Sequence, residues 1–295
     1  MTLPAFLGID VGGTSIKTRL VDVDGRTCGE WRSPTPRGDT SAERTATIIR
    51  GMFETAQRVR PVTAVGLVVP GIVDEDTGIC IRAVNLDWQD VPVRDVVQAQ
   101  LDVPLAFGHD VRAGALAESL TGASAGTSGT IVFIPIGTGL ASALIIDGVP
   151  MSSRGWAGEI GQLVLSTGPH SGRRIEEIAS AGGIARRAGA RTALAVAELV
   201  RQGDARAVLV WNDAVEVLAD AMAWITSIVA PDVFVLGGGL TEAGALLIDP
   251  LEHELLARLP LSRHPVIVRA VHGDGAAMLG ATYLARRTVG VGDPS

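Results

Sequence analysis

The sequence predicts an α/β protein made of two related domains, and three observations support this prediction. First, an apolar run before Asp10 is followed by two glycines and a threonine, after which alternating apolar and polar residues resume, a pattern typical of strand, tight turn and strand. Second, residues 137–148 repeat this arrangement, with the shared sequence G-T-x-(I/L)-x-(T/S)-x-L-(V/I) ahead of an Asp-Gly turn. Third, residues 62–69 form a continuous apolar run, which is typical of a buried parallel strand.

Both glycine turns are expected to bind phosphate. Paired glycines indicate a turn with positive φ or very close backbone approach, and such a turn aims backbone N–H groups at an anion. Asp10, at the end of the first strand, is expected to face a Mg²⁺ ion through water, because magnesium keeps several of its waters in proteins. Since the motif occurs twice, each domain is expected to present one turn to a shared phosphate chain. The residues expected to bind the nucleotide here are Gly12, Gly13, Thr14, Gly137, Thr138 and Gly139.

Composition and charge argue against several classes of protein. The 295 residues suffice for about two domains, and the 47% hydrophobic content supports a sizeable core. A net charge of −7 without a basic block argues against a nucleic-acid partner. Cys28 and Cys80 fit a reducing compartment, the N-terminus lacks a secretory pattern, and the most apolar span, residues 221–240, is too interrupted to cross a membrane. We therefore expect a cytoplasmic protein with no membrane partner.

Strand and helix patterns alternate through the first 120 residues. Thr40 and Glu43 have the spacing of a capping box, so a helix is expected to begin there. The buried strand at residues 62–69 stops at a Pro-Gly turn that contains Gly71, at the carboxyl end of a strand, where open α/β sheets bind ligands. The next elements are a strand at residues 104–107 and a helix at residues 111–120 that opens at Asp110.

The second half of the chain begins after residues 121–129, whose small polar side chains make them the best candidate linker. Its glycine turn joins strands expected at residues 130–136 and 140–146. The remaining elements are helices at residues 183–201 and 205–229, strands at 233–236 and 266–271, and helices that begin near residues 242 and 275.

Asp110 is the candidate general base. A carboxylate at a strand end that opens a helix can take a proton from a hydroxyl group as that hydroxyl attacks a γ-phosphate. The alternative is an aspartate that only caps its helix.

Other candidate ligands are polar residues in loops and strands. Asn85, Glu159 and Glu176 can bind sugar hydroxyls, because carboxylates and amides make paired hydrogen bonds to vicinal diols. Lys17 can contact phosphate. For each of these four residues the alternative is a solvated side chain without a ligand.

Gly238 and Gly239 follow a late strand and suit a glycine platform against an adenosine. The alternative, a Rossmann fingerprint, lacks the G-x-G-x-x-G spacing, and the Walker A pattern is absent from the sequence. The sequence has no Cys-x-Cys or Cys-x₂-Cys pair and its five histidines are scattered, which argues against structural zinc.

Together these motifs resemble those of the ROK sugar kinases, within the actin-like ATPase superfamily, over essentially the whole chain. The matching stretches are residues 9–14, 70–73, 85–88, Asp110 with Ala113, Ala115 and Glu118, and residues 136–139, 158–161, 176–180, 236–239 and 275–281. The family phosphorylates the 6-hydroxyl of hexoses or N-acetylhexosamines with Mg·ATP. The resemblance implies two actin-like (ribonuclease H-like) α/β domains with an interdomain cleft. The expected small domain holds residues 1–118 with a C-terminal helix at about 283–295, and the large domain holds residues 119–282.

The resemblance also implies a role for individual residues. By position, Asp110 resembles the catalytic base and Asp10 the acid on the magnesium side. The residues that resemble sugar ligands are Gly71, Asn85, Glu159 and Glu176, and those that resemble nucleotide contacts are residues 12–14, residues 137–139, Gly238 and Gly239.

Three positions depart from the family pattern. The family has Asn before the base, where this chain has His109, and it has His after the G-E-I-G sequence, where this chain has Gln162. His109 and Gln162 therefore stand at expected sugar-binding positions with different side chains. The family's cysteine-rich zinc loop is replaced by residues 168–174, so we expect a zinc-free member.

We expect an ATP- and Mg²⁺-dependent hexose kinase, most like a glucokinase, and the family implies a homodimer. One alternative keeps the fold and changes the substrates: an N-acetylmannosamine or N-acetylglucosamine kinase, or a kinase with polyphosphate as donor. The alternative from another class is a non-catalytic sugar-binding regulatory protein, which the changes at His109 and in the zinc loop would fit. Asp110 and Asp10 argue against this alternative, because a binder needs neither a base nor a magnesium site.

Overall fold

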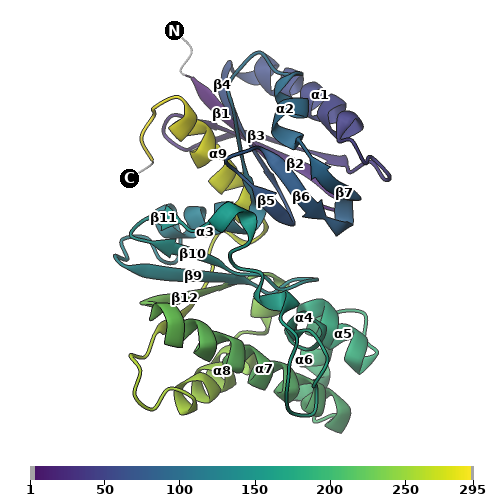
Figure 1. Cartoon of the computed structure of the whole chain (residues 1–295), viewed down its shortest axis with the longest axis vertical. Helices are drawn as coiled ribbons and strands as arrows, with labels where there is room; N and C mark the ends of the chain where they lie inside the picture. Colours follow the sequence, from purple (N-terminus) through teal and green to yellow (C-terminus); the bar gives the residue numbers. More distant parts are fainter. Residues whose placement is uncertain (1–3, 294–295) are drawn as a thin grey trace. The chain divides into compact units, whose positions relative to one another are not determined.

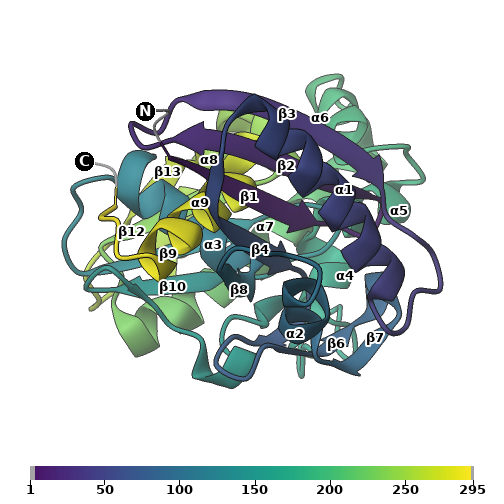
Figure 2. The ribbon, with the colours of Figure 1, turned by 90° about the horizontal axis from the view of Figure 1, so that it is seen from above.

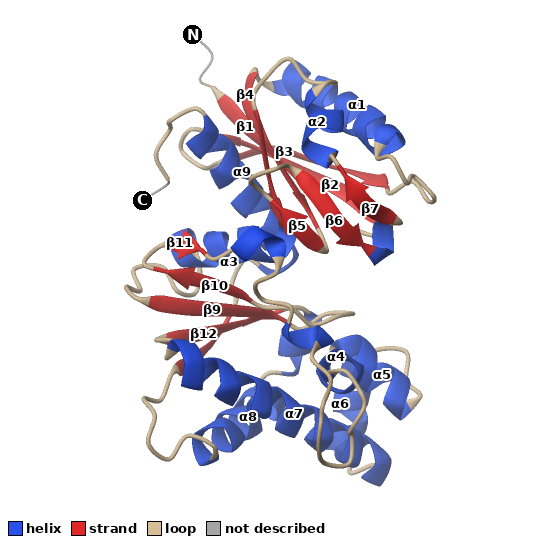
Figure 3. Cartoon of the chain, in the orientation of Figure 1, coloured by secondary structure: helices blue, strands red, loops and turns tan. Residues whose placement is uncertain are grey.

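The computed structural model describes residues 4–293, which form three β-sheets and the helices that pack on them (Figure 1, Figure 3). Backbone contacts divide the chain into two compact units, which are described separately. The first unit holds the residues up to Ala125, Pro150–Ala157 and the residues from Asp274 on, and the second holds Gly126–Val149 and Gly158–Gly273. These units are defined by contacts alone. The domain boundaries expected from the sequence, 1–118 with 283–295 and 119–282, therefore stay a prediction.

The first unit is built on a five-stranded sheet. β1 pairs antiparallel with β2 and parallel with β4, and β4 pairs parallel with β8. The parallel arrangement predicted for residues 62–69 is therefore confirmed. In spatial order the strands are β3 (Thr27–Pro34), β2 (Ser15–Asp22), β1 (Ala5–Val11), β4 (Val62–Val69) and β8 (Leu105–His109).

Helices cover both faces of this sheet. Strand residues alternate between the faces, so Leu7 and Ile9 share a core with α1 (Glu43–Val59) and α2 (Val93–Gln98), whereas Phe6 packs with α9 (Ala276–Thr288) on the other side. Figure 2 shows α1 and α9 on opposite sides of β1. α3 (Asp110–Thr121) packs closely against α9.

Small residues let α9 approach the sheet and α3. A Cβ atom added to Gly66 in β4 would lie 1.8 Å from the carbonyl oxygen of Ala281, and one added to Gly280 would lie 1.9 Å from that of Ala113. Both distances are far inside van der Waals contact, so these positions accept no side chain. Gly66 and Gly280 therefore serve close packing within the first unit.

A small three-stranded antiparallel sheet, also in the first unit, carries Asn85. It consists of β5 (Ile72–Asp74), β6 (Ile79–Ala83) and β7 (Trp88–Val91), and the 3₁₀ turn Val84–Leu86 between β6 and β7 contains Asn85.

The second unit repeats the strand order of the first. β9 pairs antiparallel with β10 and parallel with β12, and β12 pairs parallel with β13. The strands, in spatial order, are β11 (Val149–Pro150), β10 (Ala143–Ile146), β9 (Thr130–Pro135), β12 (Val233–Gly237) and β13 (Val266–Arg269). The repeated sequence motif thus lies at the same place in two sheets of the same topology.

The helices of the second unit pack around one long helix. α7 (Ala205–Val229) contacts the other four, and buried residues of all five form a single apolar core with β9 and β12. The other helices are α4 (Ile175–Ala179), α5 (Ala181–Ala188), α6 (Ala193–Arg201) and α8 (Ala245–Ala257).

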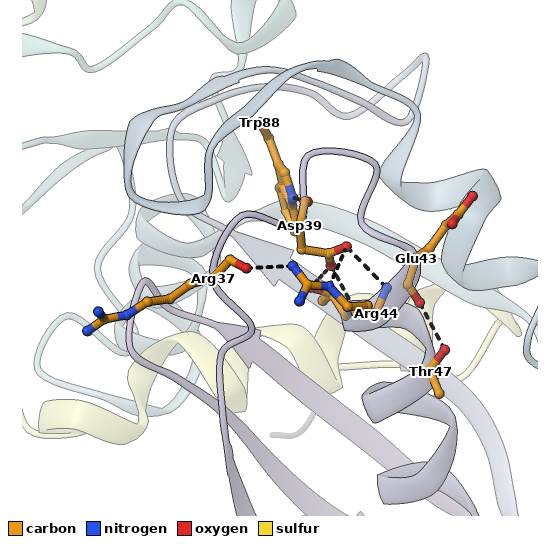
Figure 4. A network of polar contacts seen from close by, with 7 residues as sticks. Arg37, Asp39, Glu43, Arg44, Thr47 and Trp88 are labelled. Carbon is orange, nitrogen blue, oxygen red and sulfur yellow. Dashed lines mark hydrogen bonds and ion pairs between the residues drawn. The ribbon is translucent and has the colours of Figure 1, made fainter.

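The predicted capping box at Thr40 and Glu43 is wrong. α1 begins after Ala42, whose φ of 62° lies in the left-handed region and whose side chain offers no cap. Asp39 takes over this role: its carboxylate accepts hydrogen bonds from the backbone N–H of Thr45 at 2.8 Å and from the Thr45 hydroxyl at 2.7 Å. It also accepts from the backbone N–H of Arg44 at 3.2 Å (Figure 4). Burial opposes ionisation of Asp39, but these hydrogen bonds outweigh it and hold its pKa below the ordinary value.

Other predicted boundaries shift by a few residues. The helix predicted at residues 183–201 is two helices, because Gly189 ends α5 with a φ of 72° and Thr192 caps α6 through its hydroxyl. The second strand of the later hairpin starts at Ala143 instead of residue 140. Within residues 4–293, none of the helices has both the length and the apolar character of a membrane span.

Candidate functional site

The first glycine turn joins β1 to β2. The N–H of Gly12 donates to the carbonyl of Ser15 at 3.0 Å, and neither Gly12 nor Gly13 has φ in the left-handed region. Close approach explains Gly13 instead, because a Cβ atom there would lie 2.9 Å from the Cβ of Asn85. The structure thus brings a residue expected to contact phosphate beside one expected to contact sugar.

Asp10 and Lys17 face one another across this hairpin. They are directly paired in the β1–β2 register, and the Nζ of Lys17 lies 3.9 Å from Oδ2 of Asp274. Burial raises the pKa of Asp10 to about 6, with Lys17 opposing the shift and Asp274 adding to it. Asp274 was missed by the sequence analysis, since an aspartate in a Gly-Asp-Gly turn has no pattern that marks it.

The carboxyl ends of three parallel strands place the other residues of the first unit. Asp10 lies near the end of β1, Gly71 follows β4 and Asp110 follows β8, and these strands are neighbours. The three residues therefore lie along one edge of the sheet, where open α/β sheets bind ligands. Gly71 has a φ of 100°, and a Cβ atom there would lie 2.2 Å from the carbonyl oxygen of Arg82, so only glycine fits.

Asp110 is the first residue of α3. Its Oδ1 accepts a hydrogen bond from the backbone N–H of Val111 at 2.7 Å and lies 3.3 Å from Nε2 of His109. The side chain is 26% exposed, so it is partly open to solvent while its orientation is fixed. The helix N-terminus and the N–H donor both favour a negative charge at this position.

His109 is buried beneath Asp110. The side chain is 4% exposed, and its Nδ1 finds no hydrogen-bond partner among residues 4–293. Burial, together with the charge of Arg112, lowers the pKa of His109 to about 3, so the imidazole is neutral at physiological pH. The Nε2 atom of His109 faces Asp110, and a sugar contact from His109 stays a prediction.

Glu75 and Arg112 fix the start of α3, and the sequence analysis missed both. One oxygen, Oε1 of Glu75, accepts from the backbone N–H of His109 and from Nε of Arg112, each at 3.0 Å. Arg112 also donates from Nη2 to the carbonyl of Val73 at 2.9 Å. Glu75 lies in the turn after β5 and Arg112 lies in α3, 37 residues further on, so no local signal links them.

The second glycine turn follows β9. Residues Ile136 and Leu140 form a bridge, and the N–H of Gly137 donates to the carbonyl of Gly139 at 3.1 Å. A Cβ atom on Gly139 would lie 3.3 Å from Oε2 of Glu176. As in the first unit, a glycine turn lies beside an expected sugar ligand.

Ser180 anchors the second turn and was also missed. It is fully buried, its hydroxyl donates to the carbonyl of Thr138 at 3.1 Å, and the same oxygen accepts from the N–H of Gly183 at 2.9 Å. Ser180 therefore caps α5 and fixes the glycine turn at once.

The remaining expected residues of the second unit lie near these elements. Gly238 follows β12 with a φ of 79°, and a Cβ atom there would lie 2.5 Å from the carbonyl oxygen of Ile136. Glu159 precedes the 3₁₀ turn Ile160–Gln162, and its carbonyl accepts from the N–H of Gln162 at 3.1 Å. Within residues 4–293, no group of three or more His, Cys, Asp or Glu side chains is placed to hold a metal ion, and the absence of zinc stays a prediction.

Known proteins resemble this chain along almost its whole length. The model of the ROK family matches residues 6–288. A glucokinase of Halalkalibacterium halodurans is 28% identical over 96% of this chain and 95% of its own, and an N-acetyl-D-glucosamine kinase of Citrobacter koseri is 31% identical over 95% and 98%. The crystal structure of a ROK family glucokinase from Streptomyces griseus, in complex with glucose and AMPPNP, superposes with a TM-score of 0.81 at 27% identity, covering 96% of this chain and 99% of that one. The predicted α/β fold class is confirmed by this likeness.

Proposed function

Because the chain belongs to the ROK family, we propose that it is an ATP-dependent hexose kinase, with glucose as the expected acceptor. It transfers the γ-phosphoryl group of Mg·ATP to the 6-hydroxyl of the hexose. The observation that carries this proposal is the position of Asp110, a partly exposed carboxylate at the edge of the sheet that also bears the first glycine turn. The named relatives, a glucokinase and an N-acetyl-D-glucosamine kinase, support phosphoryl transfer to a sugar.

The nucleotide contacts are the two glycine turns with Gly238, Gly239 and Lys17. Gly137 and Gly239 give specific support, because neither has φ in the left-handed region and a Cβ atom on either would meet no atom within 4 Å. The fold itself does not require glycine at these positions, whereas a ligand that approaches the backbone closely does.

Asp10 fits the magnesium side of the site. Burial raises its pKa to about 6, and a nearby cation would lower that pKa again by stabilising the charged carboxylate. Asp10 would hold a water ligand of the ion. When bound, Mg²⁺ neutralises charge on the β- and γ-phosphates.

Asp110 acts on the acceptor hydroxyl. As the sugar oxygen O6 forms its bond to the γ-phosphorus, the bond from that phosphorus to the bridging oxygen breaks and ADP leaves. The proton of the 6-hydroxyl passes to the Asp110 carboxylate. The residues proposed to hold the sugar for this step are Gly71, Asn85, His109, Glu159, Gln162 and Glu176.

Three further features belong to this proposal. The protein is cytoplasmic, it forms a homodimer, and it acts without zinc and without a nucleic-acid partner. Its catalytic cycle uses both domains, with the boundaries expected from the sequence.

ADP release across a panel of hexoses and N-acetylhexosamines tests the proposal, with ATP and polyphosphate compared as donors. We expect ATP-dependent release with glucose. Preferred turnover of an N-acetylhexosamine would support a second candidate function, an N-acetylhexosamine kinase. The 31% identity to an N-acetyl-D-glucosamine kinase favours this candidate. Sugar binding without ADP release would contradict the proposed kinase activity and support a non-catalytic sugar-binding regulatory protein.

A further inference from the structure

Arg174 lies between two residues of the proposed sugar site. It precedes α4, and its Nη1 atom lies 2.9 Å from Oε1 of Gln162 and 3.0 Å from Oε1 of Glu176. One guanidinium nitrogen thus joins the 3₁₀ turn that ends at Gln162 to the helix that carries Glu176. Neither the sequence motifs nor the proposed function assigns Arg174 any role.

The backbone of Arg174 is fixed on both sides. It forms a β-bridge with Val164, and its N–H donates to Oε2 of Glu177 at 2.8 Å. This hydrogen bond, with help from Arg173, lowers the pKa of Glu177 and keeps that carboxylate charged beside the guanidinium. The Nε of Arg174 lies 3.8 Å from the same Oε2.

Hydrogen bonds also hold the loop from which Arg174 emerges. The N–H of Leu165 donates to the carbonyl of Arg173 at 2.9 Å, that of Gly172 to Leu165 at 2.8 Å, and that of Ile175 to Leu163 at 2.9 Å. Residues 168–174 therefore carry Arg174 on a backbone that hydrogen bonds hold in place, while its side chain is 46% exposed.

The contact with Arg174 affects the orientation of the Glu176 carboxylate. Its Oε1 is bound by Arg174, and its Oε2 lies on the side of the second glycine turn, 3.3 Å from the place of a Cβ atom on Gly139. An ion pair at this distance favours one orientation of the carboxylate. Without it, the Glu176 side chain would sample several rotamers.

We propose that Arg174 is a positioning residue for the sugar acceptor, which fixes the Glu176 carboxylate in one orientation and links it to Gln162. The inference rests on the proposed function, because it concerns how a sugar ligand of that function is held. It predicts an effect on sugar affinity that is separate from nucleotide affinity.

Steady-state kinetics of three variants test this inference. We expect Arg174→Ala to raise KM for the sugar by about five-fold, the upper size for a partly exposed ion pair, while kcat and KM for ATP change by less than about two-fold. Arg174→Lys is expected to recover part of the loss, because an ammonium keeps the charge but not the planar fork. The matched control is Arg173→Ala, since Arg173 is the next residue and contacts Glu177 at 3.5 Å; its sugar KM should stay at the wild-type value.

Several outcomes would overturn the inference. They are an unchanged sugar KM in Arg174→Ala, an equal rise in Arg173→Ala, or an equal rise in KM for ATP. If Arg174→Ala fails to fold by thermal melting, Arg174→Gln decides, and a wild-type sugar KM in that variant contradicts the proposal. On a Glu176→Ala background, where the ion pair to Arg174 is already absent, the effect of Arg174→Ala on sugar KM should be smaller than in the wild type. A wild-type protein that releases no ADP with any sugar defeats the proposed function itself, whereas an active wild type with an unaffected Arg174→Ala defeats only this inference.

Discussion

At the scale of single residues, the proposed proton transfer depends on Asp110, which lies 3.3 Å from His109. The Asp110 carboxylate is held by the N–H of Val111 and lies against a buried, neutral imidazole. These contacts hold the Asp110 carboxylate in one orientation at the partly exposed start of α3.

We expect Asp110→Asn to lower kcat by about two decades or more, because the amide cannot act as a general base. Sugar binding, measured by calorimetry, should persist, since the amide keeps the shape of the side chain. Asp102→Asn, which alters an exposed acid on the same unit, is the control and should retain full turnover. Near-normal kcat in Asp110→Asn would refute the role of base.

Asp10 and His109 should shift acid stability in opposite directions. The folded-state pKa of Asp10 is raised from 3.8 to about 6, so the folded protein holds more protons than the unfolded one in this window, and this group's contribution to stability falls as pH rises through it. The folded-state pKa of His109 is lowered from 6.5 to about 3, so its contribution rises with pH between these values.

The test is the melting temperature of ligand-free protein between pH 4 and pH 7. Asp10→Asn removes a charge that burial disfavours, so we expect the variant to gain stability relative to wild type as pH rises. His109→Asn should lose less stability than wild type on acidification. Parallel curves for the two variants would contradict the environments described for both groups.

At the scale of elements, strand and helix types followed from the sequence, while several boundaries did not. The apolar run of β4 and the alternation in β1 and β2 report burial directly. The start of α1 could not be predicted from the usual spacing of capping residues. The capping carboxylate comes from Asp39, which precedes the left-handed Ala42 by three residues. The break between α5 and α6 was signalled by Gly189 and Thr192, but the helical pattern on both sides masked it.

Some glycines in helices and strands leave no room for a side chain, whereas others do. Alanine substitution should distinguish the two kinds by opposite effects on stability. Gly66→Ala would place a Cβ atom 1.8 Å from the Ala281 carbonyl oxygen, so we expect a loss of about 1–3 kcal/mol or more in the free energy of unfolding. Gly51→Ala is the matched control, because Gly51 is exposed within α1 and a Cβ atom there meets nothing within 4 Å. It should gain about 0.5–1 kcal/mol through helix propensity.

Chemical denaturation of both variants measures this difference. A destabilised Gly51→Ala, or a Gly66→Ala variant as stable as wild type, would show that the packing of α9 on the sheet is not as close as described.

At the scale of the whole molecule, the internal repeat carried most of the predictable information. Two copies of one motif indicated two related domains, and the structure shows the same strand order and the same parallel strands in both units. The expected site residues follow the carboxyl ends of these strands, so sheet topology alone gathers Asp10, Gly71 and Asp110 on one edge. Glu75, Arg112 and Ser180 act through contacts that are distant in sequence, and a single sequence gives no local signal for such contacts.

Our central proposal is that both glycine turns bind the same nucleotide. Hydrogen–deuterium exchange, followed by mass spectrometry during a titration with AMPPNP and Mg²⁺, tests it most directly, because it reports the backbone amides of both turns in the same sample. We expect peptides containing residues 12–14 and 137–139 to gain protection together, with the same midpoint in ligand concentration. Protection of only one turn, of neither, or of the two at different midpoints would contradict it.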